Sequence, residues 1–243
     1  MQPPQRSAIS STAEPLPRPS PADRVIGNAG LQLLRATDRT ADGVETTFAV
    51  NVLANLVFVE ELRQHFKPPA RIVLTTSDTH FGDFRHNQGM VPAPKWREPA
   101  ALATPGTADK PDGAVAGRTA YSTSKLAVIY LVHAFARQLP AGIEIFSFNP
   151  GLVPGTGLVR DSGAITRFMF RGLMPVMTLT PYARTRSKSG ADLAAAAYGP
   201  IDAASGSYLN GSKVEPSSPE SYDPAREDAL WRELTRLSSA TRR

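Results

Sequence analysis

The sequence predicts an α/β fold, in which a mainly parallel sheet is flanked by helices, and two observations carry this prediction. Short apolar or β-branched runs alternate along the chain with longer stretches of helical periodicity, as in β-α-β units. The length of 243 residues is enough to bury the core of one sizeable domain. Composition agrees, because 41% hydrophobic and 20% charged residues are ordinary for a globular protein. The predicted strands are residues 24–26, 71–76, 143–148 and 207–209, and the predicted helices are residues 48–66, 121–139, 187–198 and 224–237.

The first residues differ from the rest of the chain. Residues 1–22 contain six prolines and several serines, and they show neither helical nor strand periodicity. We therefore predict a disordered tail at 1–22 and one folded domain at 23–243. The strand at 24–26 is expected at one edge of the sheet, where its apolar side needs a cover. Either the proline-rich tail or another subunit could supply it, so a homo-oligomer is expected.

The strand at 71–76 ends at Ser77, which points to a functional position. Active groups in open parallel sheets gather at the carboxyl ends of the strands, and a hydroxyl there can hydrogen-bond a substrate oxygen. The alternative is a serine that satisfies a turn. The next 43 residues, up to Tyr121, are rich in Gly, Pro and charge, as in a functional lid or a disordered loop. Four residues there are expected to form a substrate-facing flap: Phe81, Phe84, Met90 and Trp96.

The same loop holds acidic and histidine side chains that could suggest a metal site. They are Asp78, His80, Asp83 and His86. No predicted helix or strand fixes their spacing, and no second cluster accompanies them, so no metal site is predicted.

Tyr121 and Lys125 form the strongest chemical pattern, at the start of a strongly apolar helix. Positions i and i+4 share a helix face, with their Cβ atoms about 6 Å apart. An ammonium beside a phenol favours the phenolate and lowers a pKa that starts near 10. Tyr121 is therefore a candidate general acid/base for a carbonyl or alcohol oxygen. The alternative is a surface tyrosine and a solvated lysine.

Tyr121-Ser122-Thr123-Ser124-Lys125 resembles the Tyr-x-x-x-Lys signature of the short-chain dehydrogenase/reductase family. Asn28-Ala29-Gly30, Asn51 and Ser77 match further family motifs in order, and Asn149-Pro150-Gly151 follows. The resemblance implies a Rossmann-like fold with four catalytic residues. Tyr121 exchanges the proton and Lys125 lowers its pKa. Ser77 orients the substrate oxygen, and Asn51 binds a water that relays protons.

The resemblance also implies a nicotinamide cofactor, NADP or NAD, with no readable preference. Lys125 and Tyr121 would contact it together with Asn28, Ala29, Gly30, Thr75, Thr76, Pro150, Gly151 and Val153. A full family member has three strands, two helices and a Gly-rich turn before the position of Asn28. Only 27 residues precede Asn28 here. We therefore expect an N-terminally truncated member, lacking the first β-α-β-α-β portion, of the classical retinol-dehydrogenase and protochlorophyllide-reductase-like branch.

The predicted function is that of an NAD(P)-dependent oxidoreductase acting on a small, apolar carbonyl or alcohol. Two alternatives stay open: a non-catalytic relic that serves as a binding or scaffold module, and a sugar-nucleotide epimerase, which shares Tyr-x-x-x-Lys. The net charge of +5 comes from scattered residues, so nucleic-acid binding is not expected. The sequence has no apolar run of about 18 residues, so no membrane-spanning helix is expected. The absence of cysteine fits a cytoplasmic protein.

Overall fold

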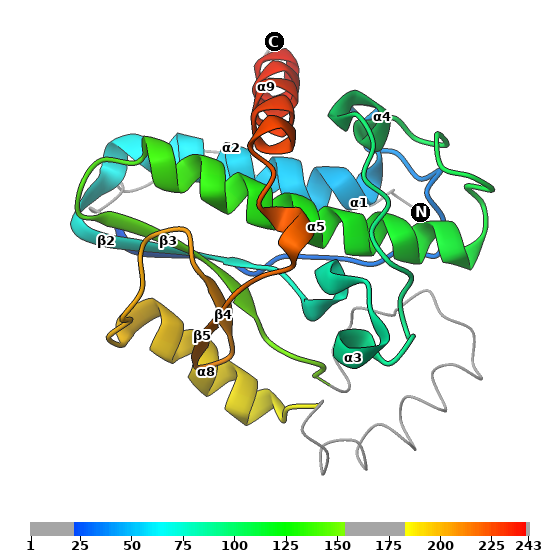
Figure 1. The fold of residues 1–243 in the computed structure, drawn as a ribbon. Coiled ribbons are helices and arrows are strands. Elements are labelled where there is room, and N and C mark those ends of the chain that lie inside the picture. Colours follow the sequence, from blue (N-terminus) through cyan, green and yellow to red (C-terminus); the bar gives the residue numbers. More distant parts are fainter. Residues whose placement is uncertain (1–21, 154–182, 242–243) are drawn as a thin grey trace, which may run out of the picture.

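The computed structural model describes residues 22–153 and 183–241, which build a five-stranded sheet with helices on both faces (Figure 1). The strand order is β1-β2-β3-β4-β5. The first three pairings are parallel, and β4 and β5 form an antiparallel hairpin. The α/β prediction is confirmed. The strands are β1 (Ala22–Gly27), β2 (Phe66–Thr75), β3 (Ile143–Asn149), β4 (Tyr208–Asn210) and β5 (Lys213–Glu215).

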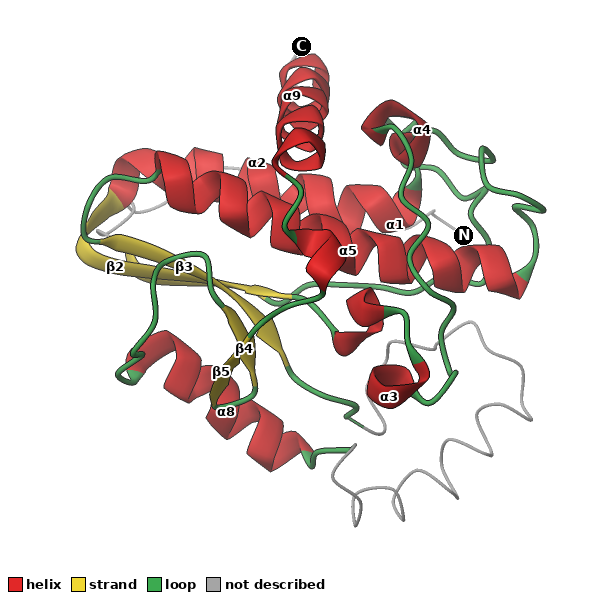
Figure 2. Ribbon diagram, viewed as in Figure 1, coloured by secondary structure: helices red, strands yellow, loops and turns green. Residues whose placement is uncertain are grey.

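One helical layer covers the face of the sheet on which most of the core lies. It contains a nearly continuous helix made of α1 (Thr46–Phe48), a π-helical segment (Ala49–Leu53) and α2 (Ala54–Leu62), and beside it the long helix α5 (Ala114–Gln138). The helix α8 (Arg186–Tyr198) lies on the opposite face, and α9 (Pro224–Thr241) packs on the outside of α5 (Figure 2). Two short helices, α3 (Phe84–Asn87) and α4 (Pro99–Ala103), lie within the segment predicted as a loop.

The central strand β3 is buried on both faces, as expected for a parallel strand between two helical layers. Ile145 faces the main core with Ile72 and Leu126, and all three side chains are fully buried. Phe146 and Phe148 face the smaller core under α8. Alternation along one strand therefore ties both helical layers to the same sheet.

The helix α5 begins at Ala114, seven residues before the predicted start at Tyr121. Its first turns pack closely against another segment at Gly117. A Cβ at this position would lie 2.3 Å from the carbonyl oxygen of Leu33. The glycine, which weakens the helical signal in the sequence, permits this contact between the helix and the loop after β1.

The strand β1 lies at the edge of the described sheet, and its described partner is β2 alone. Ile26 on β1 is 36% exposed, and aromatic side chains on helices that contact β1 are also exposed: Phe58 on α2 and Tyr198 on α8. The predicted edge position of this strand is thus observed. The predicted tail lies almost wholly outside the described residues. Among the described helices, none has both the length and the apolar character needed to cross a membrane.

Candidate active site

Tyr121 and Lys125 face the carboxyl ends of the parallel strands, as their spacing predicts. Both side chains are almost completely buried, with 6% and 4% exposure. The Lys125 Nζ lies 5.6 Å from the centre of the Tyr121 ring. It donates a hydrogen bond to the backbone oxygen of Thr75 at the end of β2, at 3.1 Å. The pair is therefore not at the solvated surface, and the alternative of a surface tyrosine with a solvated lysine does not hold.

The predicted direction of the Tyr121 pKa is not what the structure gives. Burial raises this pKa, because the phenolate loses its hydration, and Asp78 adds a like-charge effect in the same direction. A hydrogen bond with Ser77 acts in the opposite sense but does not outweigh burial. Burial also lowers the pKa of Lys125 to about 8. Sequence spacing identified the pair, but desolvation decides its protonation: Tyr121 is a neutral phenol.

Asn51 is fully buried inside the π-helical segment and joins three parts of the chain. Its side-chain oxygen accepts from the Leu31 backbone N–H at 2.9 Å. Its amide donates to the Leu31 carbonyl at 3.0 Å and to the Ser124 hydroxyl at 2.9 Å. Its own carbonyl accepts the Asn55 amide at 2.8 Å. The Asn51 side chain therefore holds the loop after β1 against α5.

The predicted cofactor-contacting residues at the ends of β1 and β2 come together. The Thr75 hydroxyl donates to the Asn28 side-chain oxygen at 2.9 Å, and Asn28, Ala29 and Gly30 are exposed beside it. Thr76 is buried and donates to the Lys125 carbonyl at 2.7 Å. A Cβ on Gly30 would lie 3.3 Å from the Lys125 Nζ. The exposed Gly30 thus lies next to the buried lysine.

Ser77 directly follows Thr76 and is half-buried. Its hydroxyl donates to the Asp78 carboxylate at 3.2 Å. Burial raises the pKa of Asp78, while hydrogen bonds from Ser77 and Asn149 and the charges of His86 and Arg184 lower it. From the sequence, Asp78 is a candidate only as a metal ligand, although its position next to Ser77 also indicates a residue of the site. In the described residues, no group of three His, Cys, Asp or Glu side chains is arranged to hold a metal ion.

His80 is buried behind Ser77 and has a defined tautomer. A carbonyl oxygen can only accept, so Nδ1–H donates to the Ser77 carbonyl at 2.6 Å. The Ser218 backbone N–H donates to Nε2 at 3.1 Å. Burial lowers the pKa of His80 to about 4. Nothing in the sequence indicates this contact between residues 138 positions apart.

The turn after β3 places Pro150, Gly151 and Val153 beside these groups. Gly151 has φ +71°, and its N–H donates to the Asn149 side-chain oxygen at 3.0 Å. Pro150 and Val153 are half-buried. Arg184 donates to the Asn149 carbonyl at 3.1 Å, a contact for which the sequence holds no periodic or motif signal.

The predicted flap is partly wrong. Trp96 packs edge-on against Tyr130 of α5, with ring centres 4.8 Å apart, and belongs to the core. Phe81 stacks on His86 at 3.7 Å, whereas Phe84 is 75% exposed. Met90 is half-buried, so Phe84 is the most exposed of the four predicted flap residues.

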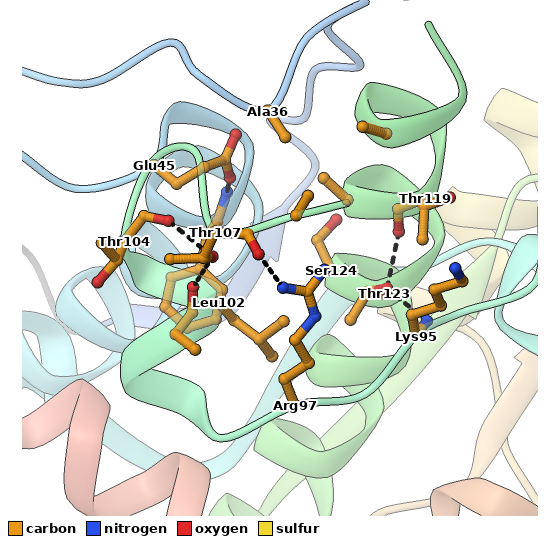
Figure 3. A pocket seen from close by; sticks show the side chains of 15 residues that line it. Ala36, Glu45, Lys95, Arg97, Leu102, Thr104, Thr107, Thr119, Thr123 and Ser124 are labelled. Atoms are coloured by element: carbon orange, nitrogen blue, oxygen red, sulfur yellow. Dashed lines mark hydrogen bonds between the residues drawn. The ribbon is translucent and has the colours of Figure 1, made fainter. Parts of the chain in front are cut away.

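A cavity of about 50 Å³ lies elsewhere, between the start of α1, α4 and the first half of α5 (Figure 3). Its lining includes the buried carboxyl group of Glu45, whose pKa burial raises, and Arg97, which points toward the cavity from the segment before α4. Ser124 reaches both this cavity and Asn51. None of the predicted catalytic residues lines it.

Comparisons with known proteins agree with the geometry of the site. A family model described as the AcuH dehydrogenase domain matches residues 159–243. Polyprenol dehydrogenase of Danio rerio is 28% identical over 231 residues, covering 89% of this chain and 62% of that protein. Protochlorophyllide reductase B of Hordeum vulgare is 31% identical over 165 residues, covering 62% of this chain and 41% of that protein.

A solved blue fluorescent protein from a metagenomic library, in complex with NADPH, shares the fold. Its TM-score is 0.50 at 21% identity, over 79% of this chain and 64% of that chain. The chain spans about half the length of the curated relatives it matches. The ordered motifs, the sheet that places them and these likenesses agree: the chain is similar in sequence and fold to proteins of the short-chain dehydrogenase/reductase family.

Proposed function

We propose that the chain carries the catalytic part of an NAD(P)-dependent oxidoreductase that interconverts a carbonyl and an alcohol. The observation that supports this most is the buried Tyr121–Lys125 pair at the carboxyl ends of the strands, with Ser77 hydrogen-bonded to Tyr121. General acid/base chemistry needs a proton donor held in a water-poor place beside a second polar group that fixes the substrate oxygen. Tyr121 and Ser77 meet this requirement.

The residues around Lys125 fit the nicotinamide end of the cofactor. A lysine ammonium has three N–H donors, and across residues 22–153 and 183–241 its hydrogen bond goes to Thr75. The ammonium lies next to the exposed Gly30, where a ribose hydroxyl could accept from its other donors. The pyrophosphate end is different, because it needs glycines that let backbone approach the phosphates. Residues 1–26 contain no glycine.

In this mechanism the chain's own side chains transfer the proton and orient the substrate oxygen. The bound nicotinamide supplies or accepts the hydride. Tyr121, neutral because burial raises its pKa, donates its proton to the substrate oxygen during reduction. Ser77 orients that oxygen and Lys125 holds the ribose. Asn51 fixes the loop after β1 against α5, so that this loop keeps its shape.

The proposed substrate class, oligomeric state and cellular location rest on separate observations. Phe84, exposed in the segment after Ser77, favours a small apolar substrate. In the part of the chain that the structure describes, β1 pairs with β2 alone, which favours a homo-oligomer, and a cytoplasmic location fits the absence of cysteine. The proposed substrate class therefore rests on Phe84 alone.

Oxidation of NADPH and NADH should be measured with a panel of apolar ketones, comparing the wild type with Tyr121→Phe. We expect Tyr121→Phe to keep its fold and cofactor affinity but to lose about 10³-fold in turnover, the scale of general acid catalysis. Equal rates in the two proteins would remove Tyr121 from the mechanism. Failure of the folded wild type to bind either nucleotide would refute the enzyme proposal.

One competing function is that of a non-catalytic binding or scaffold module, in which the buried Tyr121 and Lys125 serve packing. Fluorescence titration with NADPH separates the two. A module of this kind would retain its fold while giving no cofactor signal at millimolar concentration, whereas the enzyme proposal requires saturable binding that Lys125→Met weakens.

A further inference from the structure

Arg184 links two turns that border the candidate site. Its backbone N–H donates to the Leu152 carbonyl at 2.8 Å, which places the residue beside the chain that leaves β3. Its Nη1 donates to the Asn149 carbonyl at 3.1 Å. Its Nη2 donates to the Asn210 side-chain oxygen at 2.7 Å, at the end of β4. One guanidinium therefore spans the carboxyl ends of two neighbouring parallel strands.

Two glycines make room for this side chain. A Cβ on Gly151 would lie 3.2 Å from the Arg184 Cδ, and a Cβ on Gly211 would lie 2.6 Å from Nη1. Both glycines have positive φ, +71° and +62°, which other residues adopt at a cost. The turns after β3 and β4 are thus each shaped to receive the same arginine, although they are far apart in the sequence.

The tie continues toward the proposed catalytic groups. The Asn149 amide donates to the Asn210 side-chain oxygen, at 3.2 Å, and that oxygen also accepts from Arg184. Asn149 hydrogen-bonds Asp78, which in turn accepts from the Ser77 hydroxyl. The positive charge of Arg184 also favours the ionised form of Asp78. A fixed arginine therefore holds the acceptor toward which the Ser77 hydroxyl points.

We propose that Arg184 is a positioning residue, which sets the Asn149–Gly151 turn and the orientation of Ser77 for cofactor and substrate. This inference rests on the proposed function, in which that turn faces the nicotinamide. Arg184 itself touches neither reactant. Its two directed hydrogen bonds require the planar fork of arginine, which a lysine cannot reproduce.

The functional test compares Arg184→Met and Arg184→Lys with Arg236→Met, a control that removes an exposed arginine paired with Glu233 on α9. Each Arg184 variant loses two hydrogen bonds that the charged guanidinium donates. We therefore expect the Kd and KM for NADPH to rise about tenfold in both variants, and kcat to fall by a smaller factor. The control should match the wild type. A wild-type KM in Arg184→Lys would show that charge alone suffices and would overturn the directed tie. A loss of thermal stability in Arg184→Met with an unchanged KM would reduce the residue to a structural one.

A second measurement needs no activity. Gly211→Ala should lower the melting temperature in the wild-type background, because the new methyl group meets the guanidinium. It should lower it less in Arg184→Ala, where the space is free and backbone strain is the remaining cost. Additive losses in this double-mutant cycle would overturn the geometry. If the wild type binds no nicotinamide nucleotide, the proposed function fails, while this coupling still decides whether Arg184 ties the two turns.

Discussion

His80 gives a pH dependence of folding stability that can be worked out from its contacts. Its ring is 1% exposed and neutral, with Nδ1–H donating to Ser77 and Nε2 accepting from Ser218. Protonation would place an N–H against the Ser218 N–H and a charge in a buried site. Both effects oppose the charged form, and burial is the larger cause of the pKa falling to about 4. The perturbation is a pH change, applied to the wild type and to His80→Gln.

The sign follows from which state takes up the proton. The unfolded chain protonates His80 near the ordinary pKa of 6.5, whereas the folded protein does so only near 4. Stability from this group is therefore complete above pH 6.5 and falls as the pH drops toward 4. The full difference is about 3 kcal/mol at 1.36 kcal/mol per pKa unit, and about 2 kcal/mol is lost between pH 7 and pH 5.

Urea unfolding at pH 7 and pH 5 measures the effect as a difference of unfolding free energies. We expect the wild type to lose about 2 kcal/mol more than His80→Gln over this interval, because other titrating groups are common to both proteins. His65→Gln is the control and should follow the wild type. Equal pH dependence in the wild type and His80→Gln would show that His80 is not held neutral, and the reasoning from its two hydrogen bonds would fail.

Three further outcomes are expected. Burial lowers the pKa of Lys125 to about 8, so the ammonium loses its proton as the pH rises through 8. The Kd for NADPH, measured by fluorescence titration, should therefore rise between pH 7 and pH 9 in the wild type. In Lys125→Met it should not change over this interval. Gly117→Ala should cost about 3 kcal/mol in urea unfolding, because its methyl group would meet the backbone of Leu33, while Gly190→Ala, with open space around it, should not. Ile26→Lys should reduce self-association in light scattering, because a charge on an edge strand opposes strand pairing; an unchanged mass would separate oligomerisation from β1.

The sequence was a good guide to elements that are long or buried on both faces. The strand at 143–148 and the helix at 187–198 differ from β3 and α8 by one residue at an end. Local sequence signals did not locate the start of one helix or the shortest strands. The helix α5 starts early because Gly113 caps it without a side-chain bond and Gly117 lies inside it. The strand β5 has three residues, too few for alternation to be read, and depends on the turn at Gly211.

The candidate site shows the same limit in three dimensions. Ser77, Tyr121 and Lys125 could be placed together because strand ends and helix spacing are local rules. Arg184 and the His80–Ser218 contact depend on chain segments that meet only after folding. The pKa of Tyr121 was predicted with the wrong sign for a related reason. The spacing of two residues gives their distance, but the loss of water around both is set by the whole fold.

The hydrogen bonds that hold the proposed catalytic groups all run to segments packed on the main core. Lys125 is tied to the Thr75 carbonyl, and Thr76 is tied back to the Lys125 carbonyl. Asn51 is tied to Leu31. Each bond connects a side chain to the backbone of β2, α5 or the loop after β1, all packed on the main core. The geometry of Tyr121 and Lys125 therefore depends on that core and not on contacts beyond β1, so perturbing the β1 edge should alter assembly or cofactor affinity before it alters the proton chemistry.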